Sequence, residues 1–323
     1  MQRVDVVVVG CGISGLTCGV RLLQEGFNVS ILARLVPPNT TSDKAAAIWY
    51  PYRAYPEDKV LPWCKKTLEK FLELSELSET GVSFTELYDV FDSEVSDPWW
   101  KEAVSEFRRL QATELPQGYV DGYAAKVPLI ETPVYMPYLV KCFNALGGKI
   151  EILREELATL SELGAAHPLI INCTGLGARK LANDPAVFPI RGQVIRTKNP
   201  GIERGIADET GRLALSYIIP RSKDCVLGGT AEENNWSEEV DSEISKDIFH
   251  RCGQLDPRLT DLEIIDAKAG LRPGRNEIRL EAEHITDRYT VIHNYGHGGA
   301  GFTLSWGCAD SVVELAKQTI SVL

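Results

Sequence analysis

The sequence predicts an α/β protein in which a parallel-stranded unit is interlocked with a second unit built on a mixed sheet. The first observation is the strand-like stretch at residues 4–9, which ends in a run of four valines at 6–9 and is typical of a buried parallel strand. The second is a series of short strand-like runs between residues 190 and 227, which is typical of an antiparallel sheet. The third is that no low-complexity linker divides the 323 residues, so the two units should interleave along the chain.

The N-terminal unit has the order strand, helix, strand. The apolar run ends in three closely spaced glycines, after which Leu16, Val20 and Leu23 recur at helical spacing. The helix ends at Gly26, and residues 27–32 form the second strand of a βαβ unit. The same periodicity predicts helices over 61–77, 135–146, 239–254 and 304–323. Strands are predicted over 84–90, 149–153, 168–173, 190–196, 217–219 and 225–227.

Composition excludes several classes of protein. The chain has 34 Lys and Arg against 45 Asp and Glu, a net charge of −11, so nucleic acid or an anionic membrane is an unfavourable partner. Hydrophobic residues make up 44%, as in globular proteins, and no apolar run approaches the roughly 18 residues of a membrane-spanning helix. The eight cysteines include no CxxC pair, which argues against a zinc or dithiol site. Scattered thiols without an export signal predict a reducing, cytoplasmic location.

Gly10, Gly12 and Gly15 form a GxGxxG motif between a predicted strand and a predicted helix, the context that a dinucleotide-binding turn requires. Gly10 permits the tight turn, Gly12 lets the backbone approach a pyrophosphate, and Gly15 allows close packing of helix against strand. Ile13 and Ser14 open the helix, whose N-terminal N–H groups favour an anion.

The residues after the second strand depart from this motif. An acid is expected about 20 positions beyond the last glycine, where it holds a ribose hydroxyl, but the chain has Ala33 and Arg34 there. An arginine at this place is compatible with the 2′-phosphate of NADP; alternatively, the ribose is held in another way. The glycine motif by itself does not separate NAD(P) from FAD.

Five further segments carry distinctive motifs. The densest is VIHNYGHGGAG at residues 291–301, which Gly307 and Ala309 follow. The other four are AAAIWYPY at 45–52, NCTG at 172–175, YIIP at 217–220 and GLRPGRNEIRLE at 270–281. Together, and in this order along nearly the whole chain, they resemble the D-amino-acid oxidase family. Within that family, which includes D-aspartate oxidases, the chain is more similar to the D-amino-acid oxidase branch.

The resemblance implies FAD as the cofactor and a Rossmann-like FAD-binding domain interlocked with a mixed-sheet substrate-binding domain. The implied FAD-binding domain comprises residues 1–53, 132–188 and 282–323, and the substrate-binding domain comprises residues 54–131 and 189–281. Family members often form dimers, so a homodimer is a further expectation. The residues implied to bind FAD are Gly10, Gly12, Ile13, Ser14, Gly15, Ala33, Arg34, Thr41, Ser42, Ala46, Ala47, Ile48, Trp49, Thr174, Gly175, Arg272, Gly298, Gly299, Gly301, Phe302 and Thr303.

The same resemblance implies a site for an α-amino acid. Arg272 is the candidate anchor for the carboxylate, because a planar, permanently charged guanidinium binds that group with two N–H donors. Tyr217 shares the carboxylate through its hydroxyl, the carbonyl of Gly299 orients the amine, and Tyr52 lines the pocket. No side chain is expected to act as a catalytic acid or base.

Four other polar residues near these motifs are not assigned to the site. Arg275 and Arg279 have acids close by in the sequence and are expected to form structural ion pairs. His293 and His297 are four residues apart, but their segment is broken by glycines and no third ligand is apparent, so no metal is expected.

Two departures from the family bear on the substrate. Residues 204–216 are too few for the lid loop of several family members, and Leu213 stands where that lid has a tyrosine. The turn at Gly228 to Thr230 is followed by an alanine and two glutamates, Glu232 and Glu233, where the D-aspartate branch has an arginine. A neutral or hydrophobic D-amino acid is therefore favoured, although these acids leave a basic one open.

The implied reaction consumes a D-amino acid and oxygen. Hydride passes from Cα to flavin N5, the imino acid hydrolyses to a 2-oxo acid and ammonia, and oxygen is reduced to hydrogen peroxide. Sibling activities that stay open are glycine or sarcosine oxidase and D-aspartate oxidase. From other classes, an NADP-dependent dehydrogenase would explain Arg34, and an FAD-binding protein without turnover would share the cofactor motifs.

Overall fold

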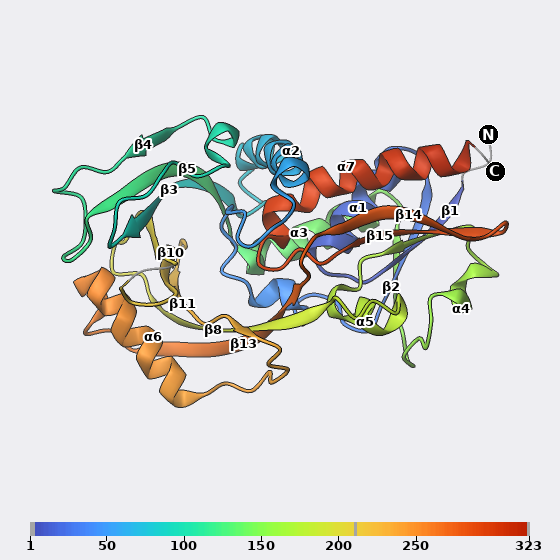
Figure 1. Ribbon diagram of the computed structural model, residues 1–323. Helices are drawn as coiled ribbons and strands as arrows, with labels where there is room; N and C mark the ends of the chain where they lie inside the picture. The colour runs from blue at the N-terminus through green and yellow to red at the C-terminus, as the bar shows by residue number, and fades with distance from the viewer. Residues whose placement is uncertain (1–3, 210–211, 322–323) are drawn as a thin grey trace.

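The computed structural model describes residues 4–209 and 212–321. Two sheets stand at opposite ends of the molecule, and each takes its strands from several separate stretches of the chain (Figure 1). This arrangement confirms the predicted α/β class with two interlocked units.

The first sheet has the strand order β14-β15-β7-β1-β2-β6. Its neighbouring strands run parallel except β14 and β15, which are antiparallel. The valines of β1 at positions 6 to 9 are buried, which explains why this strand reads as a continuous apolar run. The strand bounds are β1 Asp5–Val9, β2 Asn28–Ala33, β6 Lys149–Ile152, β7 Leu169–Asn172, β14 Arg279–Thr286 and β15 Tyr289–Tyr295.

The second sheet has the order β12-β8-β11-β10-β9-β3-β5-β4, and β13 pairs with β8 outside this path. Its pairs are antiparallel apart from β3 and β9. The long strands β8 and β13 run together from this end of the molecule toward the middle (Figure 1). The bounds are β3 Val82–Phe91, β4 Phe107–Arg109, β5 Asp121–Ile130, β8 Phe188–Lys198, β9 Gly205–Asp208, β10 Ser216–Pro220, β11 Asp224–Gly228, β12 Glu232–Glu233 and β13 Ile264–Gly274.

Helices cover both units. Helix α1 packs between α3 and α7 beside the first sheet, α2 packs against α7, and α6 packs against β8, β10 and β11 of the second sheet. The bounds are α1 Ile13–Gln24, α2 Glu57–Ser75, α3 Thr132–Ala145, α4 Ser161–Gly164, α5 Ala178–Leu181, α6 Ser242–Leu255 and α7 Gly301–Ile320. Within the described residues, no helix is both long enough and apolar enough to cross a membrane.

Several predicted boundaries are wrong by a few residues. Helix α2 begins at Glu57 rather than 61, because two acids suit its first turn after Pro56. Helix α6 begins at Ser242 rather than 239, because the Asp241 side chain caps its N-terminus by accepting the N–H groups of the second and third helical residues. Helix α7 begins at Gly301, directly after the glycine-rich turn. The described structure also contains β5, β9 and β13, which the sequence pattern did not define as strands.

Candidate active site

A cavity of about 530 Å³ runs between the two sheets, from the turn after β1 to Tyr217 on β10 and Arg272 on β13. Most of the predicted site residues line it, whereas Gly15, Trp49 and Thr303 do not. The predicted residues in its wall are Gly10, Gly12, Ile13, Ser14, Ala33, Arg34, Thr41, Ser42, Ala46, Ala47, Ile48, Tyr52, Thr174, Gly175, Tyr217, Arg272, Gly298, Gly299, Gly301 and Phe302.

The turn after β1 leaves room only for glycine at two positions. Gly10 has a φ of +109°, and a Cβ there would lie 2.4 Å from the carbonyl oxygen of Cys173. A Cβ on Gly15 would lie 1.9 Å from the carbonyl oxygen of Gly10. Gly15 therefore sets the close approach of helix to strand from outside the cavity wall.

Helix α1 starts at the cavity wall. Gly12, Ile13 and Ser14 line the cavity, and a Cβ on Gly12 would meet only the Oγ of Ser42, at 3.1 Å. The Ile13 N–H donates to that Oγ at 2.9 Å. A helix N-terminus with glycine at its entrance lets a phosphate come close to backbone N–H groups.

Beyond β2, Arg34 and two glutamates form one end of the cavity. Arg34 is ion-paired with Glu156, and Lys180 lies 3.5 Å from the same carboxylate. Glu155 and Glu156 both line this end. A 2′-phosphate here would meet carboxylates, whereas ribose hydroxyls can donate hydrogen bonds to them. The arrangement therefore argues against the NADP alternative, since Arg34 already has an acidic partner.

Trp49 and Thr303 hold the cavity wall from behind. Trp49 is fully buried, and its indole N–H donates to the carbonyl oxygen of Cys64 at 3.3 Å. The Thr303 hydroxyl accepts the N–H of Tyr50 at 3.0 Å and donates to the carbonyl oxygen of the same residue at 2.8 Å. Thr303 thus fixes the backbone of Tyr50, which itself lines the cavity.

The glycine-rich turn before α7 forms another part of the wall. Gly298 has a φ of +54°, and its N–H donates to the carbonyl oxygen of Pro273 at 2.9 Å. Gly301 and Phe302, the first residues of α7, line the cavity. The positive end of the α7 dipole therefore lies at the cavity, where it stabilises negative charge that develops on a bound group.

Arg272, Tyr217 and Tyr52 come together at the other end. The Arg272 Nη1 donates to the carbonyl oxygen of Thr230 at 2.9 Å, and in the described part of the chain Arg272 forms no ion pair. Burial raises the pKa of Tyr217 although the Arg272 charge opposes this, so the Tyr217 hydroxyl keeps its proton and can donate it in a hydrogen bond. Burial also raises the pKa of Tyr52. Among the described residues, the site thus offers a guanidinium without a carboxylate partner beside a hydroxyl donor.

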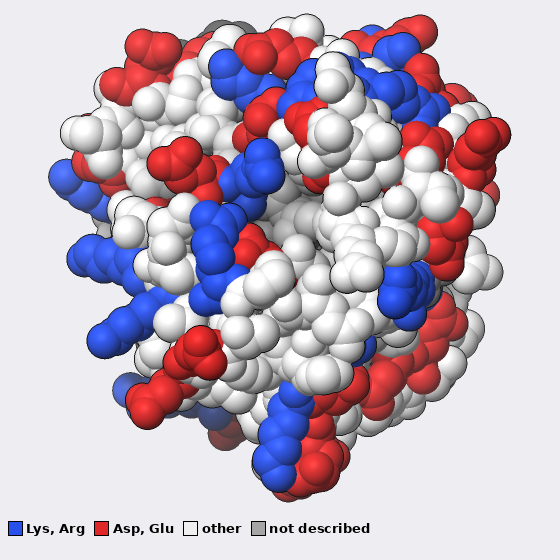
Figure 2. All heavy atoms as spheres, turned by 90° about the vertical axis from the view of Figure 1, so that its left-hand side faces the viewer, with Lys and Arg blue, Asp and Glu red and all other residues white. Residues whose placement is uncertain are grey.

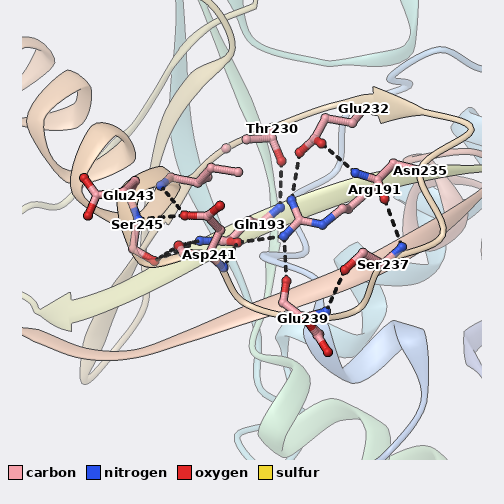
Figure 3. A network of polar contacts seen from close by, with 12 residues as sticks. Arg191, Gln193, Thr230, Glu232, Asn235, Ser237, Glu239, Asp241, Glu243 and Ser245 are labelled. Atoms are coloured by element: carbon pink, nitrogen blue, oxygen red, sulfur yellow. Dashed lines mark hydrogen bonds and ion pairs between the residues drawn. The ribbon is translucent and has the colours of Figure 1, made fainter.

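A polar network fixes Thr230 and the segment that follows it against β8 (Figure 3). The Gln193 N–H donates to the Thr230 Oγ1 at 3.0 Å, and the Gln193 side chain donates to Asp241 and Ser245. The buried Arg191 donates to Glu232 at 2.8 Å (Figure 3). The network therefore holds the carbonyl that Arg272 uses, and it occupies Glu232.

The residues not assigned to the site have partners within the fold. Arg275 pairs with Asp184 at 2.9 Å, and Arg279 pairs with two glutamates of β14 at 2.6 and 2.9 Å. His293 contacts a carboxylate of β14 at 2.8 Å. His297 contacts Asn294 at 3.0 Å, and burial lowers its pKa to about 4.

Sequence reasoning missed several residues of the wall. Glu209, directly after β9, faces the same end as Arg272, and Leu215 precedes β10. Tyr50 belongs to a quoted motif but was not assigned a role. Glu209 has no local sequence signal, because only the pairing of β9 with β3 and β10 brings it to the cavity.

The comparison with protein families defines the class. The model of the DAO family, FAD-dependent oxidoreductases, matches residues 5–315. The chain belongs to this family, and it is an FAD-dependent oxidoreductase.

Individual relatives are similar over nearly their whole length. The D-amino-acid oxidase of Rubrobacter xylanophilus is 48% identical over 98% of this chain and 96% of its own. The D-amino-acid oxidase of Dictyostelium discoideum is 40% identical, covering 99% and 94%, and human D-aspartate oxidase is 34% identical, covering 100% and 97%. Among solved structures, glycine oxidase from Geobacillus kaustophilus has a TM-score of 0.83 at 18% identity, covering 98% of this chain and 95% of that one. This last likeness shows the shared fold.

The cavity fits FAD, the cofactor of the family. It has glycine at the turn where a pyrophosphate must approach the backbone, carboxylates at the Arg34 end and the start of α7 along its wall. When bound there, the flavin supplies a two-electron acceptor. The residues that would hold it are those of the α1 start, residues 41–48, Thr174, Gly175 and the turn before α7.

Proposed function

We propose that this protein catalyses the oxidative deamination of D-amino acids with oxygen, yielding 2-oxo acids, ammonia and hydrogen peroxide. The observation that carries the proposal is the pairing of Arg272 and Tyr217 at one end of the cavity, without a carboxylate ion-paired to Arg272 in the described residues. A guanidinium left unpaired at a concave site is suited to a carboxylate that arrives with the substrate. The full-length relatives named D-amino-acid oxidase support the same assignment.

The proposed work of the chain's own residues is positioning. Arg272 binds the α-carboxylate with two N–H donors, and the Tyr217 hydroxyl donates a third hydrogen bond. The carbonyl of Gly299 accepts a hydrogen bond from the amine. With the carboxylate and the amine fixed in this way, only one enantiomer points its Cα hydrogen toward the cofactor and its side chain into the remaining space. Such positioning accounts for a large part of the rate of many enzymes.

The side-chain end of the cavity accepts a neutral or hydrophobic group in this proposal. Leu87, Leu215 and Ile219 line the cavity, and in this proposal they offer an apolar surface to an aliphatic substrate side chain. Their presence distinguishes the proposed site from one for glycine or sarcosine, which need no such surface.

The organisation of the chain is part of the same proposal. We propose the division of residues 1–53, 132–188 and 282–323 from residues 54–131 and 189–281, with the last boundary moved to the start of β14 at Arg279. A homodimer and a cytoplasmic location are likewise proposed.

The visible spectrum of the purified protein tests the function. Under anaerobic conditions, D-alanine should bleach the flavin absorption and L-alanine should leave it unchanged. A spectrum that no D-amino acid bleaches would contradict the proposal. Glycine, sarcosine and D-aspartate are compared in the same way. A colourless protein that does not take up added FAD would favour the NADP-dependent alternative.

A further inference from the structure

Glu209 stands at the junction of two cavities. The main cavity and a shallower one outside it share Tyr52, Glu209 and Leu215 in their walls. Arg53 and Arg212 line the outer cavity. Figure 2, which looks onto the end of the molecule that holds the second sheet, shows a hollow near the middle of the face with basic side chains beside it. A substrate side chain that extends outward from Arg272 and Tyr217 would pass Glu209.

Three other acids near this junction already have cationic partners. Glu232 pairs with Arg191 at 2.8 Å and Glu233 pairs with Arg53 at 2.7 Å. Asp247, in the wall of the outer cavity, pairs with Arg251 at 2.9 Å. Glu209 forms no ion pair with any described residue.

Burial and a neighbouring acid both disfavour the charged form of Glu209. Asp89 is close enough for its charge to act on Glu209. It accepts hydrogen bonds from the hydroxyls of Tyr50 and Tyr123 at 2.7 Å, and its Oδ1 has no hydrogen-bond partner among the described residues. Burial and the charge of Asp89 raise the pKa of Glu209 well above its ordinary value, while Tyr50, Arg53 and Arg272 act in the opposite direction.

Substrate binding changes this balance. Arg53 is already paired with Glu233, and the α-carboxylate of a substrate would neutralise Arg272. A substrate with a neutral side chain therefore leaves Glu209 without either of the two cations that act on it most directly, and a carboxylate in such a place tends to take up a proton. A cationic side chain would supply the missing charge within the wall.

We propose that Glu209 adapts the site to D-amino acids with a cationic side chain, such as D-arginine and D-lysine, by pairing its carboxylate with that charge. The inference rests on the proposed function, because it assumes that Arg272 binds the α-carboxylate. The sequence suggested Glu232 and Glu233 as acids that could bind a basic substrate side chain. In the structure these two glutamates are ion-paired with Arg191 and Arg53, so the proposed partner is Glu209 instead. Neutral side chains still fit, because they need only the apolar wall.

Paired substrates test this role. The value of kcat/KM is measured for D-arginine against its neutral isostere D-citrulline, and for D-lysine against D-norleucine. Glu209→Gln keeps the size of the side chain and removes its charge. It should lower the ratio of the charged to the neutral substrate at least about tenfold, while D-citrulline, D-norleucine and D-alanine change by less than about threefold. Glu243→Gln, an equal loss of charge on the exposed part of α6, should leave both ratios unchanged.

The remaining outcomes separate a failure of the Glu209 role from a failure of the proposed function. An unchanged ratio in Glu209→Gln would overturn the specificity role. An equal loss with all five substrates would also overturn it, since Glu209 would then act on the part that all substrates share. If the glutamine variant does not fold with flavin, Glu209→Leu supplies the same comparison. A wild-type protein that oxidises none of the five would refute the proposed function and the inference together, whereas turnover of D-alanine with unchanged ratios would refute the inference alone.

Discussion

The guanidinium of Arg272 lies over Gly192 on the neighbouring strand β8, where a Cβ would fall 2.2 Å from Nη1. The other two side chains proposed to bind substrate lie in the same way. The ring of Tyr217 covers Gly228, where a Cβ would lie 2.1 Å from Cζ, and the ring of Tyr52 covers Gly299, at 2.6 Å from Cδ1. The missing side chains of glycines thus create the space that the site residues occupy.

Gly192→Ala should displace the anchor without breaking the fold. The added methyl group meets the far end of a flexible side chain, so the guanidinium moves while the backbone of β8 stays in place. We expect KM for D-alanine to rise about tenfold or more, with the flavin retained, because a displaced fork loses its two-point contact. Steady-state kinetics measure KM, and the flavin spectrum shows whether the cofactor is retained. Gly253→Ala on α6, which meets only a Thr260 methyl group at 3.2 Å, is the control and should leave KM unchanged.

Removing the anchor itself should have a larger effect. Arg272→Ala is expected to lower kcat/KM for D-alanine at least about 100-fold while FAD stays bound, because a charge-assisted bidentate pair contributes several kcal/mol. Arg275→Ala removes an arginine three positions away that pairs with Asp184, and it should lower the melting temperature rather than raise KM. An Arg272→Ala enzyme that kept its KM for D-alanine would contradict the assignment.

Gly10→Ala tests the cofactor turn. A methyl group at this position would combine a φ of +109° with a backbone oxygen at 2.4 Å, and neither can be relieved by a side-chain movement. We expect the variant to lose FAD, as a rise in Kd of at least about 100-fold or as apoprotein on purification. Gly26→Ala has a comparable φ of +88° but nothing within 4 Å, so it should cost about 1 kcal/mol of stability and leave FAD affinity unchanged. Equal FAD loss in both variants would mean that strain alone, not the crowded turn, is responsible.

Local signals predicted the α/β class and the first strand, turn and helix of the chain. The glycine turn, the valine strand and helix α1 are contiguous, so their contacts could be read from spacing alone. Glu209 and Leu215 could not be found in this way, because strand pairing brings them to the cavity from segments without a motif. Gly15, Trp49 and Thr303 belong to motifs but do not line the cavity, since a motif fixes neighbours along the chain and not which of its residues reach the cavity.

His297 should make the folded protein sensitive to mild acid. Burial lowers its pKa from the ordinary 6.5 to about 4, so the unfolded chain binds a proton more tightly than the folded one. The stability contributed by the neutral form is therefore fully present above about pH 6.5, falls as pH decreases toward 4, and changes no further below that value. The difference of about 2.5 pKa units corresponds to about 3 kcal/mol at most.

Urea unfolding of the FAD-bound protein at pH 5.0 and pH 7.5 measures this effect. His297→Gln keeps an N–H donor for Asn294 and removes the titration, so its free energy of unfolding should fall less between the two pH values than that of the wild type. His250→Gln on the exposed side of α6 is the control and should keep the wild-type difference. If His297→Gln loses as much stability at pH 5.0 as the wild type does, other groups are responsible for the acid sensitivity.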